Sequence, residues 1–282
     1  MGRYSDSEGN SRKPRVAVVG DFMEDVYWIG EARSLSAEVP IPVVKINEKK
    51  KFPGGAGNVA ANLQALGIDA LWFPGGGTPR KNRLMVGDHQ LARWDEFDEC
   101  TPVYNLQRMV GIDAIVVADY GKGSVDDYTI EAIKRHQSDV AAIPIFVDTK
   151  RDPSVWSGVA TAIFPNSKEF QQFSGAYYKY DGLICWKQGD QGLRLYRDTV
   201  SIAASPAAAR QVRSVNGAGD TVLAAFVYRW LMDMDTYAYH EEGLDYEGLL
   251  DFANTAAAIA VEHPFTYAPT LAEVEARFYR NE

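Results

Sequence analysis

The most informative segment of the sequence reads Ser214-Val215-Asn216-Gly217-Ala218-Gly219-Asp220-Thr221 and opens a predicted helix that runs from Gly217 to Met232. Small residues at a helix start leave several backbone N–H groups open to one anion, and the helix dipole adds positive potential there. Asp220 in the first turn could accept a proton from an attacking hydroxyl. The same carboxylate could instead only complement the dipole. Taken alone, the segment leaves both roles of Asp220 open.

A second glycine-rich segment reads Pro53-Gly54-Gly55-Ala56-Gly57-Asn58-Val59-Ala60. Backbone without side chains lets a ligand approach closely, and a helix start can bind an anion or a hydroxyl-rich ligand. The segment also fits the loose dinucleotide fingerprint, but residues 48–53 before it do not form the apolar strand that this fingerprint requires. On its own, the segment is typical of a tight loop before a helix.

Around these two segments, apolar strands alternate with helices. The predicted strands cover residues 15–19, 70–73, 113–118, 142–147, 160–164, 183–186 and 193–196, and the predicted helices cover 59–66, 125–136, 167–173, 217–232 and 246–261. Strands that are apolar throughout indicate a mostly parallel central sheet with helices on both faces. We predict one α/β domain over residues 15–282, a flexible tail over 1–14, and small lid strands within about residues 27–48.

Composition excludes several classes of function. The 29 basic and 38 acidic residues among 282 give a net charge of −9, which is unlike a nucleic-acid-binding protein. No apolar run reaches the length of a membrane span, so we expect no membrane partner. Cys100 and Cys185 cannot form a disulfide framework, and the polar N-terminus is no signal peptide, so we expect a cytoplasmic protein.

Several common catalytic patterns are missing from the sequence. The four histidines, at positions 89, 136, 240 and 263, show no metal-ligand spacing. The sequence also contains no Walker A lysine loop, no Gly-x-Ser-x-Gly elbow and no protein-kinase signature. The two glycine-rich segments therefore remain as the candidate sites.

Taken together, the two segments resemble the two signatures of the ribokinase-like (PfkB) family of sugar kinases. Residues 54–58, with Gly67 and Gly77 at their offsets, resemble the first signature, and residues 214–226 resemble the second. The resemblance covers about residues 15–270 and implies a ribokinase-like fold. Within the family, residues 20–30 and 36–44 are most similar to the kinase domain of ADP-heptose synthases.

This resemblance implies a role for each matching residue. It makes Asp220 the catalytic base and Gly217, Ala218 and Gly219 the anion hole. The residues that would hold sugar hydroxyls are Asp21, Asp25, Gly54, Gly55 and Asn58. The residues implied for ATP are Asn166, Glu169, Lys187, Gly189, Gly192 and Asn254, with Glu169 acting on Mg²⁺ indirectly. If the acceptor carries its own phosphate, the candidates to bind it are Arg83, Lys122 and Lys150.

The sequence departs from the family in four respects. Residues 74–79 lead directly to Arg80 where relatives continue through a strand–helix unit, so we expect that unit to be missing. Ser214 and Asn216 replace residues of a monovalent-cation site, so the resemblance gives no support for potassium. Phe265 replaces a glycine near the nucleotide. We also expect no nucleotidyltransferase half, so that this chain would not attach ADP itself.

The resemblance implies ATP-dependent phosphorylation of a sugar or sugar phosphate, with heptose 7-phosphate as the favoured acceptor. One alternative is a non-catalytic relative that binds sugar or nucleotide after losing the strand–helix unit. A second alternative is a nucleoside kinase on the same fold, and a third, a dehydrogenase, rests only on the loose glycine fingerprint. We expect ATP and Mg²⁺ as cofactors, a small-molecule sugar substrate, and a homodimer formed through the lid.

Overall fold

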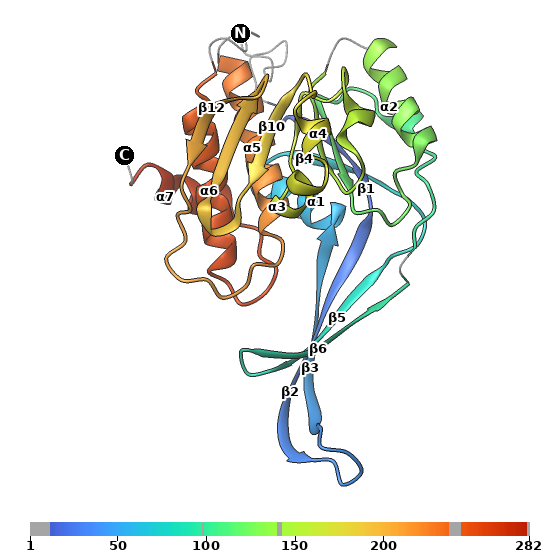
Figure 1. The fold of residues 1–282 in the computed structure, drawn as a ribbon, viewed down its shortest axis with the longest axis vertical. Coiled ribbons are helices and arrows are strands. Elements are labelled where there is room, and N and C mark those ends of the chain that lie inside the picture. The colour runs from blue at the N-terminus through green and yellow to red at the C-terminus, as the bar shows by residue number, and fades with distance from the viewer. Residues whose placement is uncertain (1–11, 98, 140–142, 237–243, 281–282) are drawn as a thin grey trace.

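A computed structural model describes residues 12–97, 99–139, 143–236 and 244–280, which form two β-sheets with flanking helices (Figure 1). The larger sheet has eight strands in the order β12-β11-β10-β9-β8-β7-β1-β4. Neighbouring strands from β10 to β4 in this order pair in parallel. The two remaining pairs, β10 with β11 and β11 with β12, are antiparallel. Their bounds are β1 Arg15–Gly20, β4 Asp69–Pro74, β7 Ala114–Asp119, β8 Ile145–Thr149, β9 Ala162–Ile163, β10 Leu183–Lys187, β11 Leu193–Arg197 and β12 Val200–Ser205. The predicted mostly parallel sheet is confirmed.

Alternate residues of the buried strands fill two separate cores, because successive side chains of a strand point to opposite faces. Val16 and Val18 of β1 pack into one core, and Ala17 and Val19 pack into the other. The first face is covered by α1 Ala56–Ala65, α5 Ala218–Thr236, α6 Tyr246–Val261 and α7 Leu271–Phe278. The second face is covered by α2 Asp127–Asp139, α3 Ser167–Gln172 and α4 Ser174–Tyr177. Coverage of both faces is confirmed.

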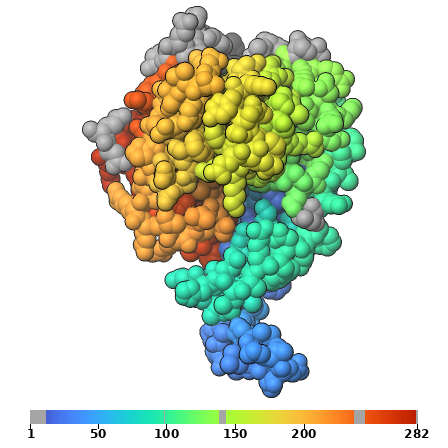
Figure 2. Space-filling view, in the orientation of Figure 1, coloured from blue at the N-terminus to red at the C-terminus, as the bar shows by residue number. Residues whose placement is uncertain are grey.

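The smaller sheet, here called the lid, has four strands in the order β3-β2-β5-β6. They are β2 Phe22–Leu35, β3 Pro42–Gly55, β5 Arg80–Val86 and β6 His89–Glu96. The hairpin of β2 and β3 projects far beyond the body of the molecule (Figures 1 and 2). The lid is therefore larger than the predicted range of about 27–48, because β2 and β3 are longer and β5 and β6 add a second hairpin.

The connection after β4 is short, as the sequence predicts. Residues 75–79 lead directly from β4 into β5 of the lid, and no helix lies between them. The chain then returns from β6 to β7 through residues 97–113, which hold one short 3-10 helix, Leu106–Arg108, and of which residue 98 is not described. The central sheet therefore receives no strand from residues 75–97.

The predicted tail over residues 1–14 needs a correction at its C-terminal end, and its residues 1–11 lie outside the described residues. The guanidinium of Arg12 donates two hydrogen bonds, of 2.7 and 2.8 Å, to the carboxylate of Asp113. Pro14 is buried. The described end of the tail is thus fixed to the body, because a bidentate arginine–carboxylate pair orients both groups.

Cys100 and Cys185 are free thiols, as expected. None of the helices in the described ranges is long and apolar enough to cross a membrane. The sequence analysis missed β12 and α7. The predicted strand at 142–147 begins in undescribed residues, and its described part is β8 Ile145–Thr149. His240 also lies outside the described residues.

Candidate active site

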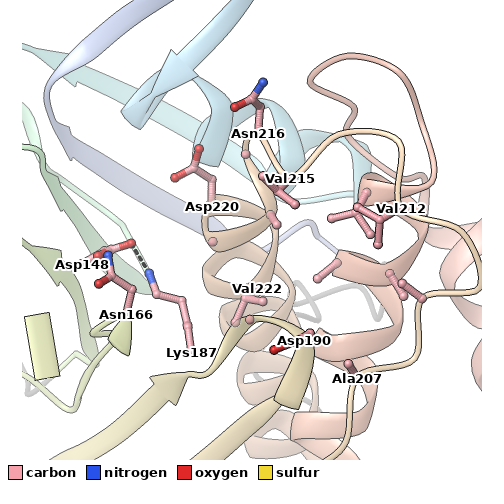
Figure 3. A pocket seen from close by; sticks show the side chains of 18 of the residues that line it. Asp148, Asn166, Lys187, Asp190, Ala207, Val212, Val215, Asn216, Asp220 and Val222 are labelled. Carbon is pink, nitrogen blue, oxygen red and sulfur yellow. Dashed lines mark hydrogen bonds and ion pairs between the residues drawn. The ribbon is translucent and has the colours of Figure 1, made fainter. Parts of the chain in front are cut away.

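A cleft of about 680 Å³ lies between the lid, the carboxyl ends of the central strands and the start of α5 (Figure 3). Asp148 lies near the end of β8 and Lys187 ends β10, so both reach the cleft from the edge where parallel strands end. This edge is where ligands bind in open α/β sheets. The residues that the sequence singled out at the start of α5 line the same cleft.

Asp220 lies in the first turn of α5 and is only 7% exposed. Its Oδ2 accepts a hydrogen bond of 2.8 Å from the side-chain amide of Asn58, and its Oδ1 accepts one from the hydroxyl of Tyr120. Burial raises the pKa of Asp220 to about 6, although these two hydrogen bonds act in the opposite direction. At neutral pH the carboxylate is therefore ionised, and it is a stronger base than an ordinary aspartate.

Gly217, Ala218 and Gly219 line the cleft at the N-terminal end of α5. Gly217 has a φ of 81°, and a Cβ at this position would lie 2.5 Å from Nδ2 of Asn58. A Cβ at Gly219 would lie 3.3 Å from Nζ of Lys187. The small residues thus let a lysine and the helix start approach the same volume, as an anion-binding site requires.

Lys187 forms an ion pair of 2.5 Å with Asp148 across the cleft floor (Figure 3). Gly189 and Gly192 line the cleft after β10, with φ values of 65° and 85°. Asn254 on α6 also lines it, and its amide donates to the Oγ of Ser205 at 3.0 Å. The structure therefore brings together four of the residues expected to bind the nucleotide.

The wall next to these residues is apolar. It consists of Ala207, Val212, Val215, Val222, Ala257 and Val261. Figure 3 shows four of them, Ala207, Val212, Val215 and Val222, with Asp148 and Asn166 on the opposite side of the cleft. A flat heterocyclic base suits such a wall better than a hydroxyl-rich sugar does.

Asn166 lines the cleft, whereas Glu169 is buried behind it. Together they form a capping box at the start of α3, in which the backbone N–H of Asn166 donates to Glu169 at 2.8 Å. Glu169 also accepts a hydrogen bond from Lys150. The Glu169 carboxylate is thus held by donors of the protein itself.

Three of the five residues expected to hold sugar hydroxyls do not line the cleft, namely Asp21, Gly54 and Asn58, and two of these, Asp21 and Asn58, are buried with protein partners. Asp21 is fully buried, and its carboxylate accepts backbone N–H groups of residues 120, 122 and 124. Asn58 is 1% exposed and donates to Asp220. We therefore correct both assignments: these side chains support the loop and the carboxylate that line the cleft, and the structure gives them no open face toward a sugar.

Asp25 and Gly55 do line the cleft, as expected. Asp25 on β2 accepts a hydrogen bond of 2.6 Å from Arg83 on β5. Gly54 lies behind Asp25, and a Cβ there would come within 2.6 Å of its Oδ2. Gly54 is thus required for the position of Asp25.

Of the three candidates to bind an acceptor phosphate, Arg83 and Lys150 line the cleft. Lys122 does not line it, and its backbone N–H donates to Asp21. The structure adds Lys81 of β5 and Arg93 of β6, which the sequence reasoning missed. The signal for Lys81 was its place two residues before Arg83, on the same face of a strand, which becomes interpretable only when β5 is known to belong to the lid.

The sequence reasoning also missed Tyr120 and Asp148, and it assigned Asn216 only by its departure from relatives. The amide of Asn216 donates to the hydroxyl of Tyr27 at 3.1 Å. Phe265, the other departure, packs against Tyr27 and Phe52 at ring-centroid distances of 4.9 and 5.6 Å. Both departures therefore form contacts between the lid and the body.

The fold resembles that of several solved kinases at low sequence identity. The ribokinase of Giardia lamblia gives a TM-score of 0.72 at 13% identity, with 95% of this chain and all of that chain (100%) covered. Phosphofructokinase-2 of Escherichia coli gives a TM-score of 0.71 at 15% identity, covering 95% and 99%. These similarities establish the ribokinase-like fold.

Curated relatives are more similar in sequence. The bifunctional protein HldE of Pseudomonas fluorescens (strain Pf0-1) is 32% identical over 323 aligned positions, which cover 95% of this chain and 64% of that protein. HldE of Shewanella sp. (strain MR-4) is 30% identical, with 76% and 55% covered. The chain thus spans less than two thirds of these relatives. Because 323 aligned positions exceed the 282 residues of the chain, the first relative contains segments that this chain lacks.

The family model described as pfkB family carbohydrate kinase matches residues 93–272. This match covers more than half of the chain and includes the start of α5 with Asp220. With the fold and the HldE relatives, it shows that the chain belongs to the pfkB family of carbohydrate kinases, which transfer a phosphoryl group to an alcohol.

Proposed function

We propose that this enzyme transfers the γ-phosphoryl group of ATP to a hydroxyl of a sugar phosphate, and that heptose 7-phosphate is the first acceptor to test. The observation that carries the proposal is a set of basic lid side chains in the same cleft as Asp220, namely Lys81, Arg83 and Arg93. A neutral sugar does not need three cations at this place. An acceptor with its own phosphate does.

The arrangement of these cations supports an anionic acceptor. Arg83 and Arg93 lie directly opposite each other in the antiparallel pair of β5 and β6. Each of them already pairs with an acid, Arg83 with Asp25 at 2.6 Å and Arg93 with Asp95 at 2.7 Å, so an anionic acceptor is supported mainly by Lys81. Lys81 is half-buried, and none of the acids in the described residues forms an ion pair with it. Burial lowers the pKa of Lys81, so a bound phosphate would relieve the cost of its charge.

The relatives favour a heptose phosphate among such acceptors. HldE proteins are among the similar curated proteins, and the alignment with that of Pseudomonas fluorescens (strain Pf0-1) covers 95% of this chain. The identity of 32% leaves the sugar itself to experiment. The nucleoside kinases among the similar structures share only the fold, at 17% identity.

The chemical step follows from the geometry around Asp220. Asp220 accepts the proton of the acceptor hydroxyl while the hydroxyl oxygen attacks the γ-phosphorus and ADP leaves. The N–H groups at the start of α5 and the ammonium of Lys187 stabilise the negative charge on the transferred group. Lys187 is held for this by Asp148.

The nucleotide end of the cleft fits ATP. The apolar wall of alanines and valines would bind the base, and the glycine turn at 189–192 leaves room for the phosphate chain. The described residues contain no cluster of three or more metal-ligating side chains. Mg²⁺ would therefore be held mainly by ATP phosphates and water, with Asp148 and Asn166 closest from the protein, and it would neutralise phosphate charge.

A substitution at Lys81 tests the acceptor. We expect Lys81→Ala to raise the KM for the sugar phosphate by about 10- to 100-fold, because a charge-assisted contact is lost, and to leave the KM for ATP nearly unchanged. Lys179→Ala is the control, since Lys179 is an exposed lysine of the body, away from the lid. Equal losses on phosphorylated and unphosphorylated sugars would contradict a phosphate site at Lys81.

We also propose a homodimer through the outer part of the β2–β3 hairpin. Five apolar side chains are 40–70% exposed there: Leu35, Val39, Ile41, Val43 and Ile46. The hairpin stands clear of the body in Figure 2. It carries both charge signs, with Glu31 on β2 paired to Lys45 on β3, so two copies can match opposite charges. An exposed apolar surface present on every copy suits an isologous dimer.

A further inference from the structure

Tyr120 directly contacts the carboxylate proposed as the base. It follows β7, and its hydroxyl donates a hydrogen bond to Oδ1 of Asp220. The other oxygen, Oδ2, accepts from Asn58 at 2.8 Å. Donors on both oxygens fix the rotation of a carboxylate, and each oxygen keeps a further lone pair for the acceptor hydroxyl.

The ring of Tyr120 is held from both sides of the cleft. Nζ of Lys81, from the lid, lies 5.4 Å from the ring centroid, and Nζ of Lys150, from the body, lies 5.7 Å from it. A Cβ at Gly55 would lie 3.4 Å from the ring, so the glycine loop also packs closely against it. Cation–π contacts of this kind favour one ring position.

The backbone of Tyr120 is held by Asp21. The N–H groups of Tyr120 and Lys122 donate to Oδ2 of Asp21 at 2.8 and 3.0 Å, and that of Ser124 donates to Oδ1 at 3.0 Å. A fully buried carboxylate with three backbone donors fixes a loop firmly. These three hydrogen bonds give the Asp21 carboxylate a structural role, although it does not reach the cleft.

We propose that Asp21 and Tyr120 are positioning residues that act in sequence: Asp21 fixes the loop of Tyr120, and Tyr120 orients Asp220 for proton transfer. This inference rests on the proposed function, because it concerns the same base. Tyr120 itself neither gives up nor gains a proton in the step. The hydroxyl of Tyr120 donates to Oδ1 of Asp220 and thereby fixes the plane of the Asp220 carboxylate.

The proposal has a signature in pH dependence. The Tyr120 hydrogen bond lowers the pKa of Asp220 against the effect of burial, so losing the bond raises this pKa further. The charged and titratable groups around Asp220 come from β2, β5, β7, β8 and β10 and their ends; they are Asp25, Lys81, Tyr120, Asp148, Lys150 and Lys187. Tyr120→Phe changes no charge among them, and it leaves the ring in place.

The test compares Tyr120→Phe with Tyr128→Phe, a change at a tyrosine of α2 that is 57% exposed. We expect Tyr120→Phe to lower kcat by about 10- to 100-fold and to move the acidic limb of the pH–rate profile upward by about one unit. The KM for ATP should stay the same, and Tyr128→Phe should match the wild type. A folded Tyr120→Phe variant with the wild-type acidic limb would overturn the proposal.

A second readout does not depend on activity. The native state of Tyr120→Phe should lose more thermal stability between pH 5 and pH 8 than the wild type does, because ionising Asp220 becomes more costly. An unchanged pH dependence of the melting temperature would also overturn the proposal. If the wild type phosphorylates no acceptor, the proposed function fails, and this measurement still decides whether Tyr120 acts on Asp220.

Asp21→Asn tests the first of these two contacts, the one between Asp21 and the loop of Tyr120. It should move the acidic limb in the same direction as Tyr120→Phe, because its amide can no longer hold all three N–H groups. In a Tyr120→Phe background, Asp21→Asn should cause little further loss of kcat, since the two residues act through one hydrogen bond. Fully additive losses would overturn the role assigned to Asp21.

Discussion

At the residue scale, the carboxylate of Asp220 is subject to opposing effects. Burial destabilises its charge, while Tyr120 and Asn58 stabilise it by hydrogen bonds. The resulting pKa of about 6 lies well above that of an exposed aspartate, 3.8. A base with this pKa is mostly ionised at pH 7 and still accepts a proton readily.

The first prediction concerns stability at this residue. The native pKa of Asp220 lies above its unfolded value, so the native state binds more protons between about pH 4 and 6, and stability falls as pH rises through this window. Asp220→Asn removes this loss. The variant should be more stable than the wild type at pH 8, by up to about 3 kcal/mol, and equally stable near pH 4. Denaturant unfolding at both pH values measures the difference, and an unstable variant at pH 8 would contradict the burial argument.

The second prediction concerns the pH dependence of the reaction. Since Asp220 acts in its ionised form, kcat should fall about tenfold per pH unit below about pH 6. A steady-state profile from pH 5 to 8, with both substrates saturating, measures this limb. A flat profile down to pH 5 would show that a different group accepts the proton, or that a later step limits kcat.

At the element scale, the start of α5 depends on a glycine for two reasons. Gly217 has a positive φ, and its hydrogen atom faces the amide of Asn58, which in turn holds Asp220. A side chain at this position therefore strains the backbone and displaces the amide. The positive φ alone costs a non-glycine residue about 1–2 kcal/mol.

The third prediction separates these two effects. Gly217→Ala should lower both stability and kcat, the latter by at least about tenfold, because Asn58 must move away from Asp220. Gly67→Ala is the matched control: Gly67 also has a positive φ, of 92°, but a Cβ there would meet nothing within 4 Å. It should lose a similar amount of stability and keep full turnover. Equal kcat values for the two variants would contradict the role of Asn58.

The elements that sequence could predict are those with a strong local signal. The helix at 246–261 matches its prediction because it is long, apolar and alanine-rich, and α1 ends before Gly67 as expected. The lid was underestimated because β5 and β6 alternate in polarity without a local sign of which sheet they join. β12 was missed because its exposed residues show no clear apolar pattern.

In the candidate site too, residues with a local sequence signal were predictable and residues with distant partners were not. The common place of Asp220 and its glycines in the cleft was predictable, because they lie within one segment. Asp21 was assigned to the sugar, since a sequence cannot show that its carboxylate binds N–H groups about a hundred residues away, in the loop at 120–124. Tyr120 was missed for the same reason, because its partner lies 100 residues further along the chain.

At the scale of the whole molecule, the lid carries the residues of both the proposed acceptor site and the proposed dimer interface. Its inner strands carry Lys81 and Arg83 into the cleft, while its outer hairpin carries the exposed apolar side chains. Contacts of Tyr27 with Asn216 and Phe265 tie the base of the lid to the body. The outer hairpin can therefore pair with another copy without disturbing the cleft of its own chain.

The fourth prediction is the oligomeric state. Light scattering after size exclusion should give twice the 31.2 kDa of one chain. Replacing Ile41 and Val43 by glutamate should give a folded monomer, because both side chains are exposed in the single chain. The control is Tyr178→Glu, a change at an exposed residue outside the hairpin, which should leave the dimer intact. A monomeric wild type would contradict the proposed interface.

The most direct test of the central claim is ADP release from Mg·ATP across a panel of sugars, sugar phosphates and nucleosides, with heptose 7-phosphate included and Asp220→Asn as the control. We predict turnover with a sugar phosphate, little with the corresponding sugar, and a loss of at least about 100-fold in the variant while ATP still binds. Turnover retained by Asp220→Asn, or a wild type that binds ATP and phosphorylates no member of the panel, would contradict the account.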